Sequence, residues 1–144
     1  MKISIIGCGY VGTVTGVCFA DFGHDIIFYD IDRKKLDLLS RGESPIYEPS
    51  LDDLIQKNRQ RLVTTSDLTA AVRDTDVTFI CVGTPSRDDG SIDLTYVLSA
   101  ATTIGQALRE TPDFHPVIVK STVFPGSTEG PIRSALEEAS GKQA

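Results

Sequence analysis

The stretch MKISIIGCGYVG, residues 1–12, decides the fold of this 144-residue chain. Residues 1–6 are a short apolar run of the kind found in buried strands, and residues 7–12 then read G-x-G-x-x-G. Residues 13–22 have the composition of a helix. The order strand, glycine turn and helix is what distinguishes a nucleotide-binding βαβ unit from a chance set of three glycines.

Each glycine of the motif has its own physical task. Gly7 permits the tight turn out of the strand, Gly9 has no side chain to keep a pyrophosphate from the backbone, and Gly12 lets the helix lie close on the sheet. A helix that begins near Tyr10 points free N–H groups and its positive dipole end at the phosphates. The segment therefore predicts a dinucleotide site.

A second predicted strand, residues 25–29, ends at Asp30, about 20 residues after the glycine motif. A carboxylate at this position accepts hydrogen bonds from the adenosine ribose hydroxyls and repels a 2′-phosphate. The sequence therefore favours NAD over NADP. Arg33, Lys34 and Lys35 follow closely and argue for NADP, but we interpret Arg33 and Lys34 as exposed charges on the next helix.

The composition, with 40% hydrophobic and 24% charged residues, is that of an ordinary globular domain with a core of its own. The net charge is −6 and no basic cluster exceeds residues 33–35, so we expect no nucleic-acid partner. No apolar stretch reaches membrane-spanning length and the N-terminus is not a signal peptide, so a cytoplasmic location without membrane contact is expected.

The three cysteines, Cys8, Cys18 and Cys81, are scattered among apolar neighbours. Their odd number and spacing argue against a disulfide framework or a zinc site, and no other metal site is predicted. We interpret all three as small buried residues and not as catalytic thiols.

The rest of the chain alternates predicted helices and strands. Helices are expected over residues 33–41, 50–58, 67–73, 94–108 and 127–139, with Ser66 and Asp93 as caps, and strands over residues 61–64, 77–82 and 117–120. This alternation predicts an α/β fold with a Rossmann-like, doubly wound parallel sheet. Five strands are visible where a full dinucleotide fold has six, so a fragment truncated before the sixth strand is expected.

Ligands of such sheets bind beyond the carboxyl ends of the strands. Here these ends are residues 7–12, Asp30, residues 82–85 and residues 121–122, and we expect all four to face one crevice. Thr84 and Thr122 would then place hydroxyls beside the phosphates and the nicotinamide. From the pattern alone, the same hydroxyls serve equally well to cap helices or to satisfy turns.

Longer stretches carry a resemblance to a known family. They are IIGCGYVGTVTGVCFADFGHDI (residues 5–26), YDID (29–32) with Lys35, GESPIYEPSLDDLI (42–55), FICVGTPSRDDGSIDLTYV (79–97) and VIVKSTVFPGST (117–128). On these stretches, residues 1–144 resemble the N-terminal NAD-binding domain of the UDP-glucose/GDP-mannose dehydrogenase family. Within it the chain looks most similar to the UDP-glucose 6-dehydrogenases.

The resemblance implies a set of cofactor-binding residues. They are Gly7, Gly9, Tyr10, Val11, Gly12, Asp30, Lys35, Val82, Gly83, Thr84, Pro85, Ser121 and Thr122. The backbone of residues 9–12 holds the pyrophosphate, and Asp30 with Lys35 holds the adenosine ribose. Ser121 and Thr122 lie near the nicotinamide, and Thr122 has a supporting catalytic role because it helps to position water or substrate.

The reaction that the resemblance implies is the oxidation of UDP-glucose to UDP-glucuronate by two NAD⁺ and water, through an aldehyde and a cysteine thioester. The nucleophilic cysteine belongs to a G-G-x-C-x-P-K-D motif that this chain lacks, and none of its three cysteines matches it. The central dimerisation helix and the C-terminal sugar-nucleotide domain are missing too. We therefore expect a homodimeric full-length enzyme, and no activity from this chain alone.

Two alternatives remain at this point. Members that oxidise GDP-mannose or N-acetylated UDP-sugars share the cofactor domain, although SPIYEP favours UDP-glucose. In a different class, NAD-sensing regulatory modules of transport systems are also short Rossmann units, but they do not need GESPIYEP, VGTP or VKST.

Overall fold

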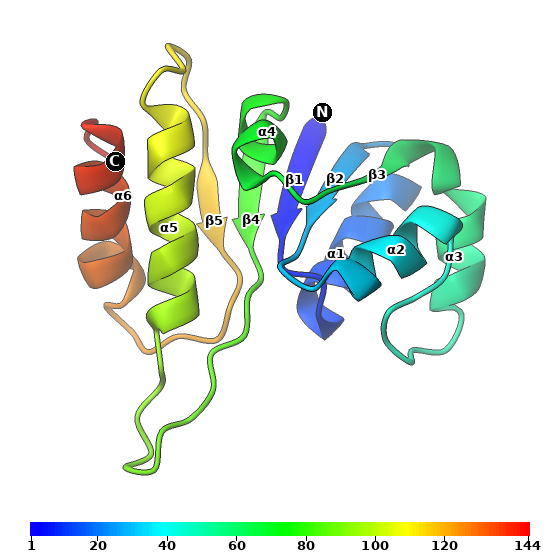
Figure 1. Ribbon diagram of the computed structural model, residues 1–144, viewed down its shortest axis with the longest axis horizontal. Helices are drawn as coiled ribbons and strands as arrows, with labels where there is room; N and C mark the ends of the chain where they lie inside the picture. The colour runs from blue at the N-terminus through cyan, green and yellow to red at the C-terminus, as the bar shows by residue number, and fades with distance from the viewer.

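The computed structural model describes residues 1–144 as one parallel five-stranded sheet with helices on both faces (Figure 1). The strands are β1 Lys2–Ile6, β2 Asp25–Tyr29, β3 Leu62–Thr65, β4 Val77–Ile80 and β5 Val117–Val119. They lie in the order β3-β2-β1-β4-β5, and every neighbouring pair is parallel. The predicted doubly wound, Rossmann-like sheet is confirmed, with its switch point between β1 and β4.

Six helices cover the sheet: α1 Tyr10–Asp21, α2 Arg33–Arg41, α3 Leu51–Lys57, α4 Leu68–Arg73, α5 Thr95–Leu108 and α6 Arg133–Ser140. A short 3₁₀ turn, η1 Arg59–Arg61, precedes β3, and a wider turn of π type, η2 Thr128–Ile132, precedes α6. Helices α1 to α3 pack on one face, α4 and α5 on the other, and α6 lies beside α5 (Figure 1). None of the helices is long and apolar enough to cross a membrane.

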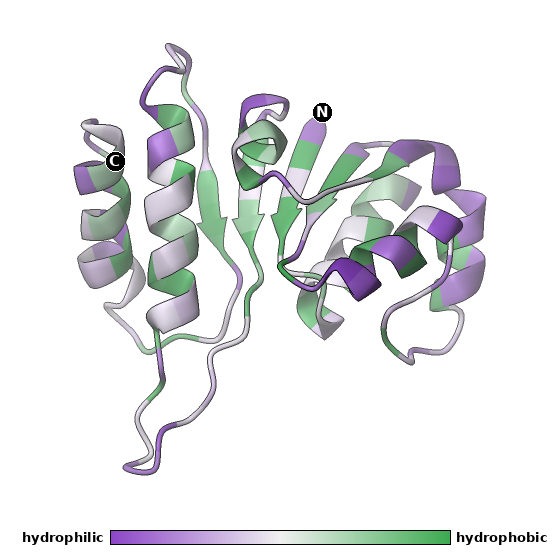
Figure 2. Ribbon diagram, viewed as in Figure 1, coloured by the Kyte–Doolittle hydropathy of each residue, from purple (hydrophilic) through white to green (hydrophobic).

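The core has two halves because side chains of a strand alternate between its faces. Ile5 of β1 packs with α1, α2 and α3, whereas Ile6 and Ile80 pack with α4 and α5. The apolar segments are accordingly concentrated in the strands and on the adjoining helix faces (Figure 2). A sheet that is buried on both sides explains why its strands read as continuous apolar runs.

Several predicted boundaries were wrong by one or more residues, those of α4, β4 and the last helix among them. Ser66 is not the cap of α4, because the Asp67 carboxylate accepts the Ala70 N–H at 3.1 Å and the helix begins one residue later. Strand β4 ends at Ile80 and not at Val82. The predicted helix 127–139 is divided into η2 and α6, because Gly130 has φ −101° and ψ −108° and the following residue is a proline.

Asp93 is not the N-cap of α5, because Leu94 holds that position, but its carboxylate still stabilises the start of the helix. Its Oδ1 accepts the backbone N–H of Thr95 at 2.9 Å and the Thr95 hydroxyl at 2.5 Å. The helix itself begins at Thr95.

A chain of polar side chains is buried in the α4–α5 half of the core, near the ends of the strands farthest from the glycine turn. Ser4 Oγ and Thr78 Oγ1 lie 2.7 Å apart, and both side chains are completely buried. Thr78 Oγ1 also lies 2.8 Å from His115 Nε2, and the Thr75 hydroxyl lies 3.1 Å from Ser4 Oγ. Burial lowers the pKa of His115 below its ordinary value of 6.5, although the charge of Asp76 opposes this shift.

This network predicts that the fold loses stability in acid. Because the pKa of His115 is lower in the folded state, the unfolded chain binds the proton more tightly, and stability falls as the pH drops below about 6.5. We expect urea unfolding at about pH 8 and at about pH 5 to show this loss, and His115→Gln to reduce the difference. The same substitution at His24 is the control. An equal pH dependence in the His115 variant and the wild type would contradict the prediction.

Candidate functional site

A crevice of about 610 Å³ opens beyond the carboxyl ends of the strands. It is lined by Ile6, Gly7, Gly9, Tyr10, Val11, Tyr29, Asp30, Ile31, Asp32, Lys35, Leu68, Cys81, Val82, Gly83, Thr84, Tyr96, Ser99, Ala100, Thr103, Ser121 and Thr122. The prediction that the four strand ends share one crevice is confirmed. Of the site residues expected from the sequence, only Gly12 and Pro85 do not line it.

The glycine turn holds the backbone open toward this crevice. Gly7 has φ +104°, and its N–H donates to the Tyr29 carbonyl at 2.8 Å. A Cβ on Gly9 would meet nothing within 4 Å, so an open space borders the loop there. Helix α1 follows at once, and its N-cap residue Gly9 offers no side chain to the first N–H groups. These N–H groups remain free for an anion at the helix N-terminus.

Gly12 and Pro85 act behind the crevice wall. A Cβ on Gly12 would lie 1.8 Å from the Gly7 carbonyl oxygen and 3.1 Å from Cys81 Cβ. Gly12 therefore serves the close packing of α1, the task expected from the motif, and offers no contact surface. The Pro85 carbonyl accepts the Asp93 N–H at 2.8 Å and so closes the loop that leads to α5.

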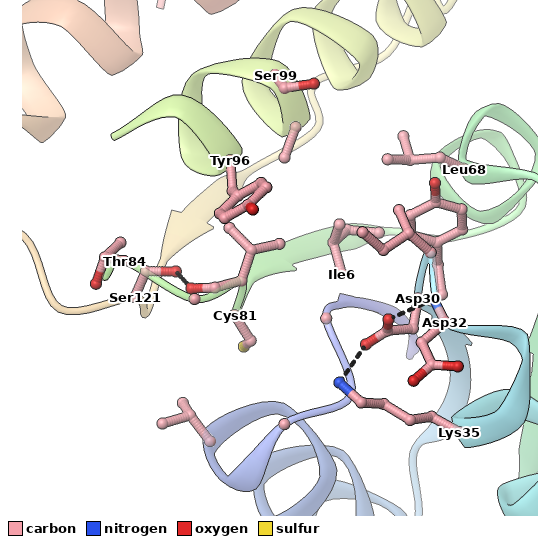
Figure 3. A pocket seen from close by; sticks show the side chains of 18 of the residues that line it. Ile6, Asp30, Asp32, Lys35, Leu68, Cys81, Thr84, Tyr96, Ser99 and Ser121 are labelled. Atoms are coloured by element: carbon pink, nitrogen blue, oxygen red, sulfur yellow. Dashed lines mark hydrogen bonds and ion pairs between the residues drawn. The ribbon is translucent and has the colours of Figure 1, made fainter. Parts of the chain in front are cut away.

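Asp30 lies at the end of β2 and is only 7% exposed. Its Oδ2 accepts the Cys8 N–H at 2.6 Å, its Oδ1 accepts the Asp32 N–H at 2.8 Å, and Lys35 Nζ lies 3.4 Å from Oδ2 (Figure 3). Lys35 lines the crevice, whereas Arg33 and Lys34 are exposed and do not. This placement agrees with our interpretation of the three basic residues.

On the other side of the crevice, two hydroxyls tie the β4 and β5 loops together. Ser121 Oγ donates to the Val82 carbonyl at 2.7 Å, and Thr84 Oγ1 donates to the Thr122 carbonyl at 2.8 Å. The Thr84 hydroxyl therefore satisfies a turn, as the alternative interpretation expected, because its hydrogen is donated to a backbone carbonyl. Thr122 is exposed at the crevice, and its hydroxyl makes no hydrogen bond within the protein. Of the three hydroxyls of Thr84, Ser121 and Thr122, only that of Thr122 is thus free to meet a ligand.

The sequence reasoning missed one whole wall of the crevice. This wall comes from α5 and the start of α4, and it consists of Leu68, Tyr96, Ser99, Ala100 and Thr103. Figure 3 shows Tyr96 and Ser99 on α5 and Leu68 on α4 on the same side of the crevice, opposite Lys35. The four lining residues of α5 are spaced i, i+3, i+4 and i+7 along the chain, which marks one helix face. Two hydroxyls and a tyrosine on that face were the available signal.

Two of the three cysteines offer no reactive thiol. Cys8 and Cys81 are buried as predicted, whereas Cys18 is only partly buried. Burial raises the pKa of Cys81 to about 12 and raises the pKa of Cys8 as well. At neutral pH both are uncharged thiols, and a thiol is a far weaker nucleophile than a thiolate.

Comparison with known proteins gives the site its context. The sequence profile described as "UDP-glucose/GDP-mannose dehydrogenase family, NAD binding domain" matches residues 1–144. A GDP-mannose 6-dehydrogenase of Pseudomonas aeruginosa is 47% identical over 100% of this chain and 34% of its own length. The UDP-glucose 6-dehydrogenase AglM of Haloferax volcanii is 46% identical over 99% of this chain and 33% of its own length.

Solved structures contain domains with the same fold. A ternary complex of the GDP-mannose dehydrogenase from P. aeruginosa superposes with a TM-score of 0.97 at 46% identity, covering 99% of this chain and 33% of that one. A UDP-glucose dehydrogenase from Pyrobaculum islandicum gives a TM-score of 0.93 at 42% identity, with the same coverage. The chain thus spans about a third of the length of these relatives.

Proposed function

Because this chain belongs to the UDP-glucose/GDP-mannose dehydrogenase family and matches its NAD-binding domain throughout, we propose that it is the cofactor-binding part of an NAD-dependent sugar-nucleotide 6-dehydrogenase. The observation that carries the proposal is the crevice itself. It brings the open backbone at Gly9, the free N-terminus of α1 and the buried carboxylate of Asp30 into one cavity. These groups suit a pyrophosphate and a ribose without a 2′-phosphate.

In this proposal each edge of the crevice holds one part of NAD. The backbone at Gly9, Tyr10 and Val11 receives the pyrophosphate, and Asp30 with Lys35 receives the adenosine ribose. Residues 82–84 form the wall between the two nucleosides, with Pro85 behind it. NAD⁺ held by these residues would supply the acceptor for the hydride that leaves C6 of the sugar.

Ser121 and Thr122 border the nicotinamide in this arrangement. The Ser121 hydroxyl is committed to the Val82 carbonyl and keeps the loop in place. The Thr122 hydroxyl makes no hydrogen bond within the protein, so it can position a water or the sugar beside the ring. This is the supporting role that we propose for Thr122.

The substrate we propose is UDP-glucose, which the GESPIYEP stretch favours. GDP-mannose is the second candidate, because the relatives named for the two sugars are 46% and 47% identical to this chain. As parts of the same proposal, the whole enzyme is a cytoplasmic homodimer. It makes sugar acids for polysaccharide biosynthesis, and its nucleophilic cysteine and sugar-nucleotide domain lie outside these 144 residues.

Calorimetric titration with NAD⁺ and NADP⁺ tests the cofactor assignment. We expect NAD⁺ to bind and NADP⁺ to bind at least about tenfold more weakly, since the 2′-phosphate would meet the carboxylate of Asp30. Asp30→Ala should narrow the difference in affinity between the two nucleotides. A sample that melts cooperatively but binds neither nucleotide would overturn the assignment.

An activity assay tests the substrate. A polypeptide in which this chain is joined to the sugar-nucleotide domain should reduce NAD⁺ with UDP-glucose faster than with GDP-mannose. The isolated chain should form no NADH with either sugar nucleotide. Faster turnover of GDP-mannose would select the second candidate, and NADH formation by the isolated chain would refute the proposed division of labour.

A further inference from the structure

Asp30 makes a contact that ribose binding does not require. Its Oδ2 accepts the backbone N–H of Cys8 at 2.6 Å, within the glycine turn and 22 residues earlier in the chain. The Asp30 carboxylate is 7% exposed, and its other oxygen accepts the Asp32 N–H at 2.8 Å. Both oxygens therefore bind backbone before any cofactor arrives.

The Cys8 contact is the strongest polar link between the glycine turn and β2. The other two are the Gly7 N–H at 2.8 Å and the Cys8 thiol at 3.6 Å, both on the neutral Tyr29 carbonyl. A hydrogen bond to an ionised carboxylate is shorter and roughly twice as strong as one between neutral groups. Burial of Asp30 strengthens it further, because little water competes for the oxygen.

The position of Cys8 makes this link important for binding. Cys8 stands between Gly7, which turns the chain at φ +104°, and Gly9, whose open side borders the crevice. Glycine restricts the backbone little, so neither neighbour fixes the orientation of the Cys8 peptide through its own backbone preferences. Fixing the Cys8 N–H fixes the direction in which Gly9 and the first N–H groups of α1 point.

We propose that Asp30 is a positioning residue of the glycine turn as well as a ligand of the ribose. The carboxylate holds Cys8 so that the pyrophosphate site is formed before NAD binds. This inference rests on the proposed function, in which the turn receives the pyrophosphate. It also means that Asp30→Ala weakens the binding of both NAD and NADP through the glycine turn, while the difference between them narrows only because the carboxylate no longer faces the ribose.

Lys35 is not part of the link. Its ammonium lies 3.4 Å from Asp30 Oδ2, and its side chain is 35% exposed. The Cys8 N–H keeps its acceptor when this cation is removed. Lys35→Ala therefore changes the ribose region but leaves the hydrogen bond between Cys8 and Asp30 in place. Asp37→Ala removes an exposed carboxylate from α2 and controls for net charge.

The first test uses the unliganded chain and amide NMR. We expect the Cys8 amide proton to resonate downfield and to exchange slowly in the wild type, in Lys35→Ala and in Asp37→Ala. In Asp30→Ala it should move upfield and exchange faster. Asp30→Asn keeps the shape and one carbonyl oxygen, so it should show a smaller upfield shift and stands in if the alanine variant fails to fold. A Cys8 amide that is unmoved in the Asp30 variants would overturn the proposal.

The second test uses an NAD analogue whose adenosine ribose lacks its 2′- and 3′-hydroxyls. If Asp30 acted on the ribose alone, its removal would not change the affinity for this analogue. We expect Asp30→Ala to weaken binding of the analogue about tenfold and Asp37→Ala, which lies outside the crevice, to leave it unchanged. An unchanged affinity in Asp30→Ala would overturn the positioning role. If the wild type binds no NAD, the proposed function fails, and the NMR result still decides the Cys8 link.

Discussion

Gly9→Ala is expected to remove most of the NAD affinity of this domain while leaving its stability intact. The backbone at Gly9 has φ −85° and ψ −165°, which alanine adopts without strain. The added Cβ would meet no protein atom within 4 Å. The methyl group would instead project into the space that we assign to the pyrophosphate. Overpacking of a tight contact costs about 1–3 kcal/mol, which corresponds to a loss of about 5- to 150-fold in affinity.

Thermal melts and calorimetric titrations of the same samples separate the two effects. The melting temperature of Gly9→Ala should equal that of the wild type or rise slightly, because alanine restricts the unfolded chain. Gly130→Ala is the control for binding only, since the residue lies outside the crevice but its φ −101° and ψ −108° lie outside the regions that alanine favours. It should bind NAD as the wild type does. A folded Gly9→Ala protein with undiminished affinity would show that the pyrophosphate does not approach this part of the turn.

The glycine turn was predictable because its geometry is set by neighbours in the sequence. Gly7 needs a positive φ where the chain leaves β1, and the structure has it at +104°. Asp30 was placed correctly for the same kind of reason, since it directly follows β2 and β2 pairs with β1 in parallel. Once two strands are parallel neighbours, the residues that follow them meet at one edge of the sheet.

Contacts between distant segments were less accessible. The α5 wall of the crevice depends on how α5 rotates on the sheet, and Ala100 and Ala101 are both buried although only Ala100 borders the cavity. An amphipathic pattern gives the buried face of a helix but not which edge of that face meets a cavity. The same limit hid the link between Asp30 and Cys8, because a side chain that serves a ligand and one that serves the backbone have the same signature in sequence.

The wrong boundaries share another cause. Ser66 and Asp67 are both good caps, and the choice between them depends on which side chain reaches the Ala70 N–H. For the last helix, the apolar spacing on either side of Gly130–Pro131 predicted one continuous helix. Proline has no N–H to donate, and the segment is divided there into a wide turn and a shorter helix. Local chemistry decided both cases against the longer pattern.

Gly12→Ala should have the opposite effect to Gly9→Ala and destabilise the fold itself. The new Cβ would lie 1.8 Å from the Gly7 carbonyl oxygen, which belongs to the backbone and cannot rotate away. Helix α1 would have to move off the sheet and lose contacts with the core around Val17 and Ala20. We expect a loss of about 3 kcal/mol or more in the free energy of unfolding, measured with urea.

The pair of variants separates the two uses of one motif. Both introduce the same methyl group into the same turn, so a difference in unfolding free energy reflects only what each Cβ meets. A Gly12→Ala protein as stable as Gly9→Ala would contradict the prediction. It would mean that the new methyl group has room beside the Gly7 carbonyl oxygen, which a Cβ 1.8 Å away would not have. With the expected result, Gly12 sets the position of the helix, Gly9 keeps the space in front of it open, and Asp30 holds the backbone between Gly7 and Gly9 in place.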